Sequence, residues 1–107
     1  MLIAGRPARS CITEIGSIGD AEITTIEGLG TIENPHPLQQ AFIDEQAAQC
    51  GYCINGMIMA AKDLLDRNPR PTEQDVREAL ATNLCRCGTH GRIVRAVLRA
   101  AQSMGKT

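Results

Sequence analysis

The chain has very few aromatic residues: Phe42 and Tyr52 are the only two, and there is no tryptophan. A core built from Ala, Ile, Leu, Val and Met buries less apolar area per residue than an aromatic core. In 107 residues, which is one domain or one domain with an appendage, such a core is marginal. We therefore expect an additional stabilising element, such as a bound metal.

Long apolar runs and a basic excess are also missing. The longest apolar stretch, residues 57–61, is too short to span a bilayer, and residues 1–12 lack the apolar run of a secretory signal. A net charge of -1 argues against binding to nucleic acid or to a membrane surface. We predict a soluble, cytoplasmic protein that binds no nucleic acid and does not insert into a membrane.

The charge that is present is unevenly distributed. Residues 84–107 contain five basic and no acidic side chains. We interpret this stretch as a solvated helix face with favourable cations near a helix C-terminus, in preference to a binding patch.

The hydrophobic pattern changes along the chain. Residues 1–4, 8–13 and 22–26 are β-like, but they are too few to form a stable sheet alone. After Asn34-Pro35-His36-Pro37 the periodicity becomes helical. The first predicted helix covers about 37–46, and the fourth covers about 91–103. The second contains the apolar positions of residues 57–65 and ends at Asn68-Pro69. The third begins at Thr72, which can form a capping box with Asp75. These patterns predict a mainly α, four-helix domain over residues 34–107, preceded by a separate segment, 1–33.

Five cysteines in a cytoplasmic chain indicate metal ligands or redox catalysts before disulfides. Cys50 and Cys53 precede the second predicted helix, Cys85 and Cys87 precede the fourth, and Cys11 is left over. If these two helices meet N-terminus to N-terminus, four thiolates lie between two positive dipole ends. Such a site favours an anionic metal-thiolate cluster.

Three chemistries fit this spacing. A [2Fe-2S] cluster takes four thiolates and tolerates mixed spacings. A structural zinc site is compatible with C-x-x-C, although C-x-C is a less usual second half. A thiol-disulfide enzyme would use CGYC alone and leave the second pair without a role. The spacing favours iron-sulfur and leaves all three open, so a zinc-stabilised interaction module and a thiol-disulfide oxidoreductase remain alternatives.

The sequence segments around the cysteines resemble those of a known protein family. The segments QCGYC, INGMIMAAKDLLDRNPRPTEQDVREAL, ATNLCRCGTH and GRIVRAV closely resemble the C-terminal helical [2Fe-2S] domain of the xanthine oxidase family of molybdenum hydroxylases. The forms HPLQQAFIDEQAAQCGYC and CRCGTHGRI are most similar to the small iron-sulfur subunit of bacterial nicotinate dehydrogenases. LIAGRPARSC and ITTIEGLG resemble the last hairpin of the family's plant-type, β-grasp ferredoxin domain and the linker that follows it. By this resemblance residues 1–33 are a remnant of that domain.

The resemblance also implies roles for individual residues. Gln49 matches a glutamine that contacts the pterin of the molybdenum cofactor in relatives. Cys11 matches the last ligand of the family's other cluster, whose remaining ligands would lie before Met1, so we expect an N-terminally truncated chain on which that second cluster cannot form. The ligands implied for the one remaining [2Fe-2S] cluster are Cys50, Cys53, Cys85 and Cys87.

The function implied is electron transfer. The resemblance implies an oxidoreductase subunit that passes electrons from a molybdopterin centre, held by a large partner subunit, through its [2Fe-2S] cluster. The substrate would be nicotinate, a related N-heterocycle or an aldehyde, and a flavin or cytochrome subunit would accept the electrons. No catalytic residue is assigned to this chain, because the substrate chemistry belongs to the partner.

Overall fold

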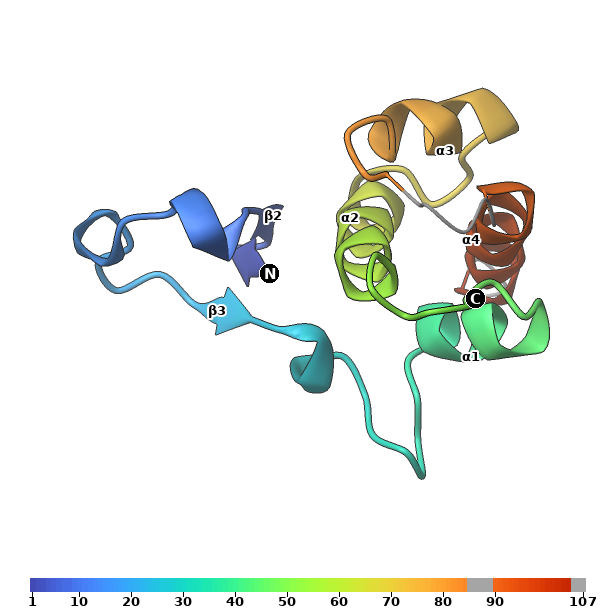
Figure 1. The fold of residues 1–107 in the computed structure, drawn as a ribbon, viewed down its shortest axis with the longest axis horizontal. Coiled ribbons are helices and arrows are strands. Elements are labelled where there is room, and N and C mark those ends of the chain that lie inside the picture. The colour runs from blue at the N-terminus through green and yellow to red at the C-terminus, as the bar shows by residue number, and fades with distance from the viewer. Residues whose placement is uncertain (85–89, 105–107) are drawn as a thin grey trace.

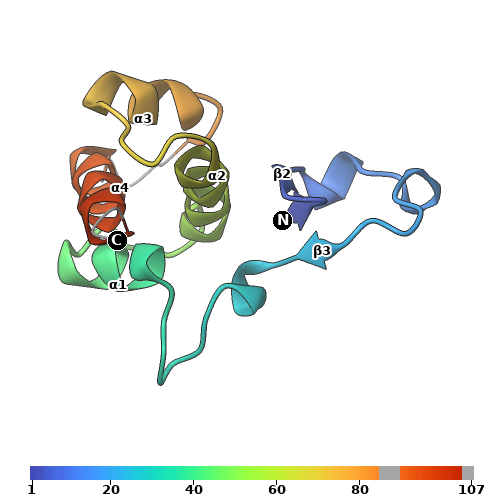
Figure 2. The same cartoon turned by 180° about the vertical axis from the view of Figure 1, so that it is seen from behind.

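The computed structural model describes residues 1–84 and 90–104, which form a small sheet followed by four helices (Figure 1). Seen from behind, the helices again lie together on one side and the N-terminal segment on the other (Figure 2). The strands are β1 (Leu2–Ile3), β2 (Arg6–Pro7) and β3 (Ile23–Thr24). Three short 3-10 helices are η1 (Ser10–Ile12), η2 (Ile15–Ser17) and η3 (Ile26–Gly28). The α-helices are α1 (Pro37–Asp44), α2 (Ile54–Arg67), α3 (Glu73–Ala79) and α4 (His90–Met104).

The sheet is antiparallel, in the order β2-β1-β3. Ala4 and Gly5 connect β1 to β2 with φ values of 53° and 81°, the left-handed backbone that a tight two-residue hairpin requires. Leu2 faces Pro7 on one side and Thr24 on the other. Each of these three strands is two residues long, and the expectation that they do not form a stable sheet alone stays a prediction.

The β-like run predicted over residues 8–13 is wrong. The structure has η1 there, and the hydroxyl of Thr13 donates a 2.7 Å hydrogen bond to the carbonyl oxygen of Arg9. A side chain that satisfies a local backbone carbonyl competes with a strand ladder. Pro7 adds to this effect because it has no N–H to offer a neighbouring strand.

The four predicted helices are confirmed, with small differences at their ends. α2 stops at Arg67 before Asn68-Pro69, as expected from the proline. α3 is capped by Thr72, whose hydroxyl accepts the amide of Asp75 at 3.2 Å while the Asp75 carboxylate accepts the amide of Thr72 at 3.0 Å. This reciprocal pair is the predicted capping box.

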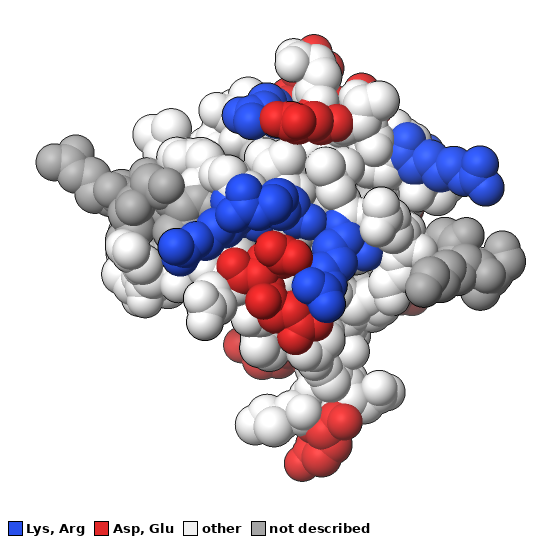
Figure 3. Space-filling view, turned by 90° about the vertical axis from the view of Figure 1, so that its right-hand side faces the viewer, with Lys and Arg blue, Asp and Glu red and all other residues white. Residues whose placement is uncertain are grey.

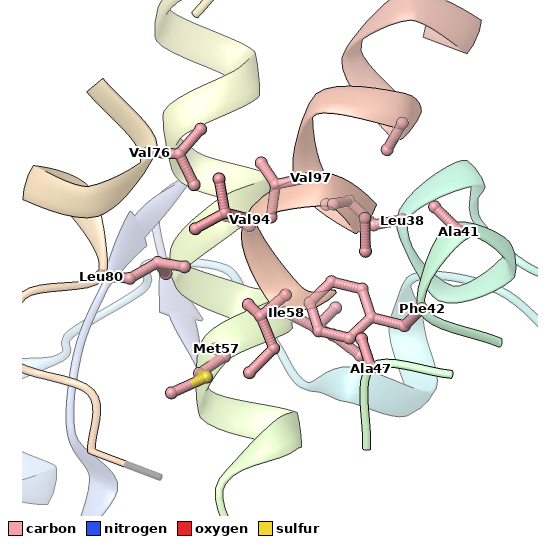
Figure 4. Close-up of a cluster of buried hydrophobic side chains, with 14 of the residues drawn as sticks. Leu38, Ala41, Phe42, Ala47, Met57, Ile58, Val76, Leu80, Val94 and Val97 are labelled. Carbon is pink, nitrogen blue, oxygen red and sulfur yellow. The ribbon is translucent and has the colours of Figure 1, made fainter. Parts of the chain in front are cut away.

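The four helices share one apolar core. Figure 4 shows side chains from all four helices and from the loop after α1 gathered in a single cluster. Ala96 and Ala100 of α4 are completely buried, and such small side chains let α1 pack closely on α4. The largest fully buried side chains are Leu38, Met57, Val76, Ile93 and Val97.

The N-terminal segment packs against the helical part through α2. Leu2 is only 4% exposed, and the guanidinium of Arg9 donates a 3.0 Å hydrogen bond to the carbonyl oxygen of Thr82, just after α3. Between the sheet and α2 lies an open cavity of about 560 Å³, lined in part by Thr24 and Lys62. The domain boundary after residue 33 stays a prediction.

Three arginines of α4, Arg92, Arg95 and Arg99, form a basic stripe that does more than face solvent. Figure 3 shows basic side chains lying directly against acidic ones on the side of the molecule where α1 and α4 meet. Arg99 lies 3.0 Å from a Glu45 carboxylate oxygen and 3.5 Å from Asp44, and Arg95 lies 3.7 Å from Glu45. The stripe therefore contacts the acidic C-terminal end of α1. In the described ranges, no helix combines the length and apolarity needed to cross a bilayer.

Candidate metal centre

The first cysteine pair lies in the loop between α1 and α2, and a helix-ending motif directs the chain into that loop. The amide of Ala47 donates to the carbonyl of Phe42 at 2.9 Å, and the amide of Gln46 donates to the carbonyl of Ile43 at 3.1 Å. With Gln46 at φ 52°, these two bonds form a Schellman motif. Ala47 is fully buried, so the loop starts from a fixed point in the core.

The loop is shaped so that Cys50 can accept a backbone hydrogen bond. Gly51, between the cysteines, has φ 81°, a conformation that suits glycine. The amide of Tyr52 then donates to the Cys50 sulfur at 3.5 Å. Amide donors to cysteine sulfur stabilise thiolate charge and tune iron-sulfur clusters. The CGYC loop thus directs one backbone amide at the sulfur of Cys50.

Cys53 is the N-cap of α2, and its carbonyl accepts the first helical hydrogen bond, from Met57, at 3.2 Å. It is half-buried and packs against the core, whereas Cys50 is exposed. The first amides of a helix lack helical partners and carry partial positive charge, which favours a negatively charged group beside them. The pair therefore combines one cysteine anchored against the core with one that is accessible to solvent.

The predicted second pair, Cys85 and Cys87, lies outside the described residues. The chain that leads to it is described as far as Leu84. A Cβ atom built on Gly56, in the first turn of α2, would lie 3.4 Å from the side-chain amide nitrogen of Asn83. The described chain thus brings residue 83, two positions before Cys85 in sequence, against the helix turn that follows Cys53.

Gln49 and Cys11, the other predicted site residues, are both exposed. Gln49 directly precedes Cys50, and Cys11 lies in η1, on the segment that Arg9 ties to Thr82. Within residues 1–84 and 90–104, no group of three or more metal-binding side chains comes together. Cys50 and Cys53 are the pair of predicted ligands that these ranges contain.

Two residues with structural roles, His36 at the start of α1 and Arg92 beside the cysteine loop, were given no role by sequence reasoning. His36 is the N-cap of α1: its Nδ1 accepts the amide of Leu38 at 3.1 Å, while Gln39 accepts the amide of His36 at 2.9 Å. The sequence signal was a polar residue before a proline, with glutamine three positions later. Arg92, in the first turn of α4, donates to the carbonyl of Gln46 at 3.4 Å, and no sequence pattern pointed to this contact.

Comparison with known proteins bears on the metal. Residues 25–98, a range that includes both cysteine pairs, match the family described as [2Fe-2S] binding domain. The chain is 58% identical over 106 residues to one subunit of the nicotinate dehydrogenase of Pseudomonas putida, covering 99% of this chain and 68% of that protein. It is 50% identical to the alpha subunit of isoquinoline 1-oxidoreductase of Brevundimonas diminuta, covering 94% and 65% respectively.

The fold has a solved counterpart. Aldehyde oxidoreductase from Desulfovibrio gigas matches with a TM-score of 0.94 and 44% identity, covering 99% of this chain and 12% of that one. The chain thus spans about two thirds of the two relatives above and a small part of this longer polypeptide. Of the three chemistries compatible with the cysteine spacing, the family match supports iron-sulfur. The chain belongs to the [2Fe-2S]-binding domain family of the iron-sulfur subunits of molybdenum hydroxylases.

Proposed function

We propose that this chain is the electron-transfer module of a molybdenum-dependent hydroxylase. The observation that carries the proposal is the CGYC loop, in which an amide of the chain already donates to a ligand sulfur at the start of α2, inside a segment that matches a [2Fe-2S] family. The proposed ligands of the cluster are Cys50, Cys53, Cys85 and Cys87.

When bound, the cluster supplies one-electron transfer. The work of the chain is to hold and tune it. The first amides of α2 and the Tyr52 amide favour negative charge at the sulfurs, and reduction adds to that charge. Ile54, packed against the core next to Cys53, limits solvent on the buried side of the loop. The amides and the apolar side chain shift the reduction potential in opposite directions. The amides favour the more negative, reduced state, and an apolar environment disfavours the added charge.

The proposed partner is a large subunit that holds the molybdopterin cofactor. Tyr52, between Cys50 and Cys53 in sequence, is 95% exposed, and Leu84, directly before Cys85, is 82% exposed. An aromatic and an aliphatic side chain in such positions are typical anchors of a protein interface. Gln49, exposed beside Cys50, is the residue we propose to contact the pterin across this interface.

We propose an aromatic N-heterocycle, such as nicotinate, or an aldehyde as the substrate. Relatives of this chain are named for nicotinate, isoquinoline and aldehyde oxidation, which supports this class. A flavin or cytochrome subunit is the proposed electron acceptor, and the cytoplasm is the proposed location because reduced thiols persist there.

The test is the visible absorption spectrum of anaerobically purified protein, with iron and acid-labile sulfide measured per chain. We expect about two of each and bleaching on reduction. Cys53→Ser should lose the cluster and much of the helical circular dichroism, because the ligand also stabilises the fold. Cys11→Ser is the matched control and should keep both. A colourless protein that contains zinc, or a Cys53→Ser variant with unchanged iron content, contradicts the proposal.

A further inference from the structure

Arg92 reaches from one cysteine-bearing segment to the other. It lies in the first turn of α4, five positions after Cys87 in sequence, and its guanidinium donates to the carbonyl of Gln46, four positions before Cys50. We propose that Arg92 is a positioning residue, which holds the CGYC loop in place. We further propose that its positive charge, which no carboxylate of the described residues offsets, raises the reduction potential of the cluster. This inference rests on the proposed function.

The surroundings of Arg92 support its place beside the loop. Arg92 lines an open cavity of about 880 Å³ together with Ala48, which precedes the cysteine pair, and with Ile54 and Asn55, which follow it. Arg92 therefore lines the same cavity as residues on both sides of CGYC. Arginine suits such a position, because it remains charged at every relevant pH and offers several donors.

The acceptor of the Arg92 hydrogen bond is the carbonyl of Gln46, a residue with an unfavourable backbone conformation. Gln46 has φ 52°, a left-handed conformation that is unfavourable for a residue other than glycine, and it lies just after α1, beyond the C-cap Glu45. A carbonyl in such a turn lies outside the helical hydrogen-bond pattern and needs a donor from another part of the chain or from water. A cation that binds this carbonyl stabilises the turn from which the loop to Cys50 starts.

Arg92 differs from its neighbours on the same stripe. Arg95 and Arg99 lie against the carboxylates of Glu45 and Asp44, which offset their charge. Within the part of the chain that the structure describes, the bond of Arg92 is to a neutral carbonyl. Its charge is therefore available to the proposed cluster, whose ligand set becomes more negative by one charge on reduction.

The experiment is a redox titration of the cluster, followed by electron paramagnetic resonance, in wild type, Arg92→Gln, Arg92→Lys and Arg95→Gln. The rate at which a chelator removes visible absorption is measured in parallel. Arg92→Gln should have a lower reduction potential and lose its cluster severalfold faster. Arg92→Lys should recover most of the potential, because the charge remains, but only part of the retention. Arg95→Gln removes the same charge one turn further along and should shift the potential much less.

Several results would overturn the inference. Equal shifts in Arg92→Gln and Arg95→Gln would mean that only the total charge of the stripe matters. A potential in Arg92→Lys as low as that in Arg92→Gln would remove the electrostatic role. If Arg92→Gln fails to fold, Arg92→Lys is compared with wild type: a clearly lowered potential would overturn the electrostatic role, and a wild-type rate of cluster loss would overturn the positioning role. A wild-type protein without a cluster overturns the proposed function together with this inference, whereas an Arg92→Gln protein identical to a cluster-containing wild type overturns this inference alone.

Discussion

His36 shows how much one side chain contributes to the start of the helical domain. Its Nδ1 accepts the amide of Leu38, so the imidazole must be unprotonated on that nitrogen. Burial lowers the pKa of His36 below its usual value near 6.5, and the nearby Lys62 ammonium lowers this pKa further, while Asp66 acts in the opposite direction. The neutral form that caps α1 is therefore the form that the folded protein favours.

Protonation of His36 should destabilise the fold at mildly acidic pH. Because the pKa is lower in the folded state than in the unfolded state, the stability that this group contributes is complete above about pH 6.5 and is lost as the pH falls toward the folded value. His36→Asn keeps a capping acceptor but cannot titrate. Urea unfolding at pH 7.5 and pH 5.5 should show a smaller loss of stability for His36→Asn than for wild type. An equal loss in both proteins would contradict this prediction.

At the residue scale, the sequence was enough to identify the paired cysteines but not the residue that contacts the start of their loop, Arg92. Cys50 and Cys53 were recognisable because two closely spaced cysteine pairs, each before a predicted helix, are typical of metal or redox sites. Arg92 was not, since its bond to the Gln46 carbonyl depends on how α1 and α4 pack, which no local pattern encodes. The roles of Cys50 and Cys53 as ligands and of Arg92 as a positioning residue stay predictions.

At the scale of elements, α1 ends under a constraint that glycine would relieve. Gln46 occupies the left-handed position of the Schellman motif, where glycine is usual. We expect Gln46→Gly to raise the free energy of unfolding by about 0.5–1 kcal/mol, because the left-handed strain disappears while the carbonyl that Arg92 binds is kept. Gln40→Gly, on an exposed helical position of the same helix, is the matched control and should cost about 1 kcal/mol. Chemical denaturation measures both, and effects of the same sign would contradict the assignment.

The contact between α1 and α4 combines ion pairs and apolar packing, and magnitudes decide which matters more. The pair of Arg99 with Glu45 is about half exposed at the arginine, and exposed pairs contribute roughly 0–1 kcal/mol. Leu38 is completely buried, and its truncation to alanine should cost about 2–5 kcal/mol. We expect Arg99→Gln to shift the urea midpoint slightly and Leu38→Ala strongly. A larger loss for Arg99→Gln would show that the ion pairs dominate this contact.

Helices were predictable from sequence because their apolar spacing is local and their caps are short motifs. Thr72 and Asp75 showed the start of α3, and Pro69 showed the end of α2. The strand expected over residues 8–13 failed for the opposite reason. Ile12 is 78% exposed, so no core enforces a strand there, and the Thr13 hydroxyl bonds to a local carbonyl instead.

The whole molecule depends on one modest core. Its buried side chains are almost all aliphatic, with Phe42 as the sole buried aromatic in the described ranges. The loop with Cys50 and Cys53 starts at buried Ala47 and ends at α2, and Asn83 meets α2 next to this loop. A metal cluster that joins the two cysteine pairs would therefore cross-link segments that are far apart in the sequence, where closing a long loop restricts the unfolded chain most.

Removal of the cluster should accordingly lower the stability of the entire helical domain. A ligand bound only by the folded state at a hundredfold excess over its Kd adds about 2.7 kcal/mol, and a domain of this size shifts its Tm by roughly 4–8 °C per kcal/mol. We expect the protein freed of iron by a chelator under anaerobic conditions to melt at least about 10 °C lower, as followed by far-ultraviolet circular dichroism. Amide hydrogen exchange should show the largest loss of protection in residues 46–57, since that loop would lose its anchor, and a smaller loss in α3, which has its own capping box. Reconstitution with iron and sulfide should restore both signals, whereas an apoprotein as stable as the holoprotein would mean that the aliphatic core suffices and the cysteines contribute only electron transfer.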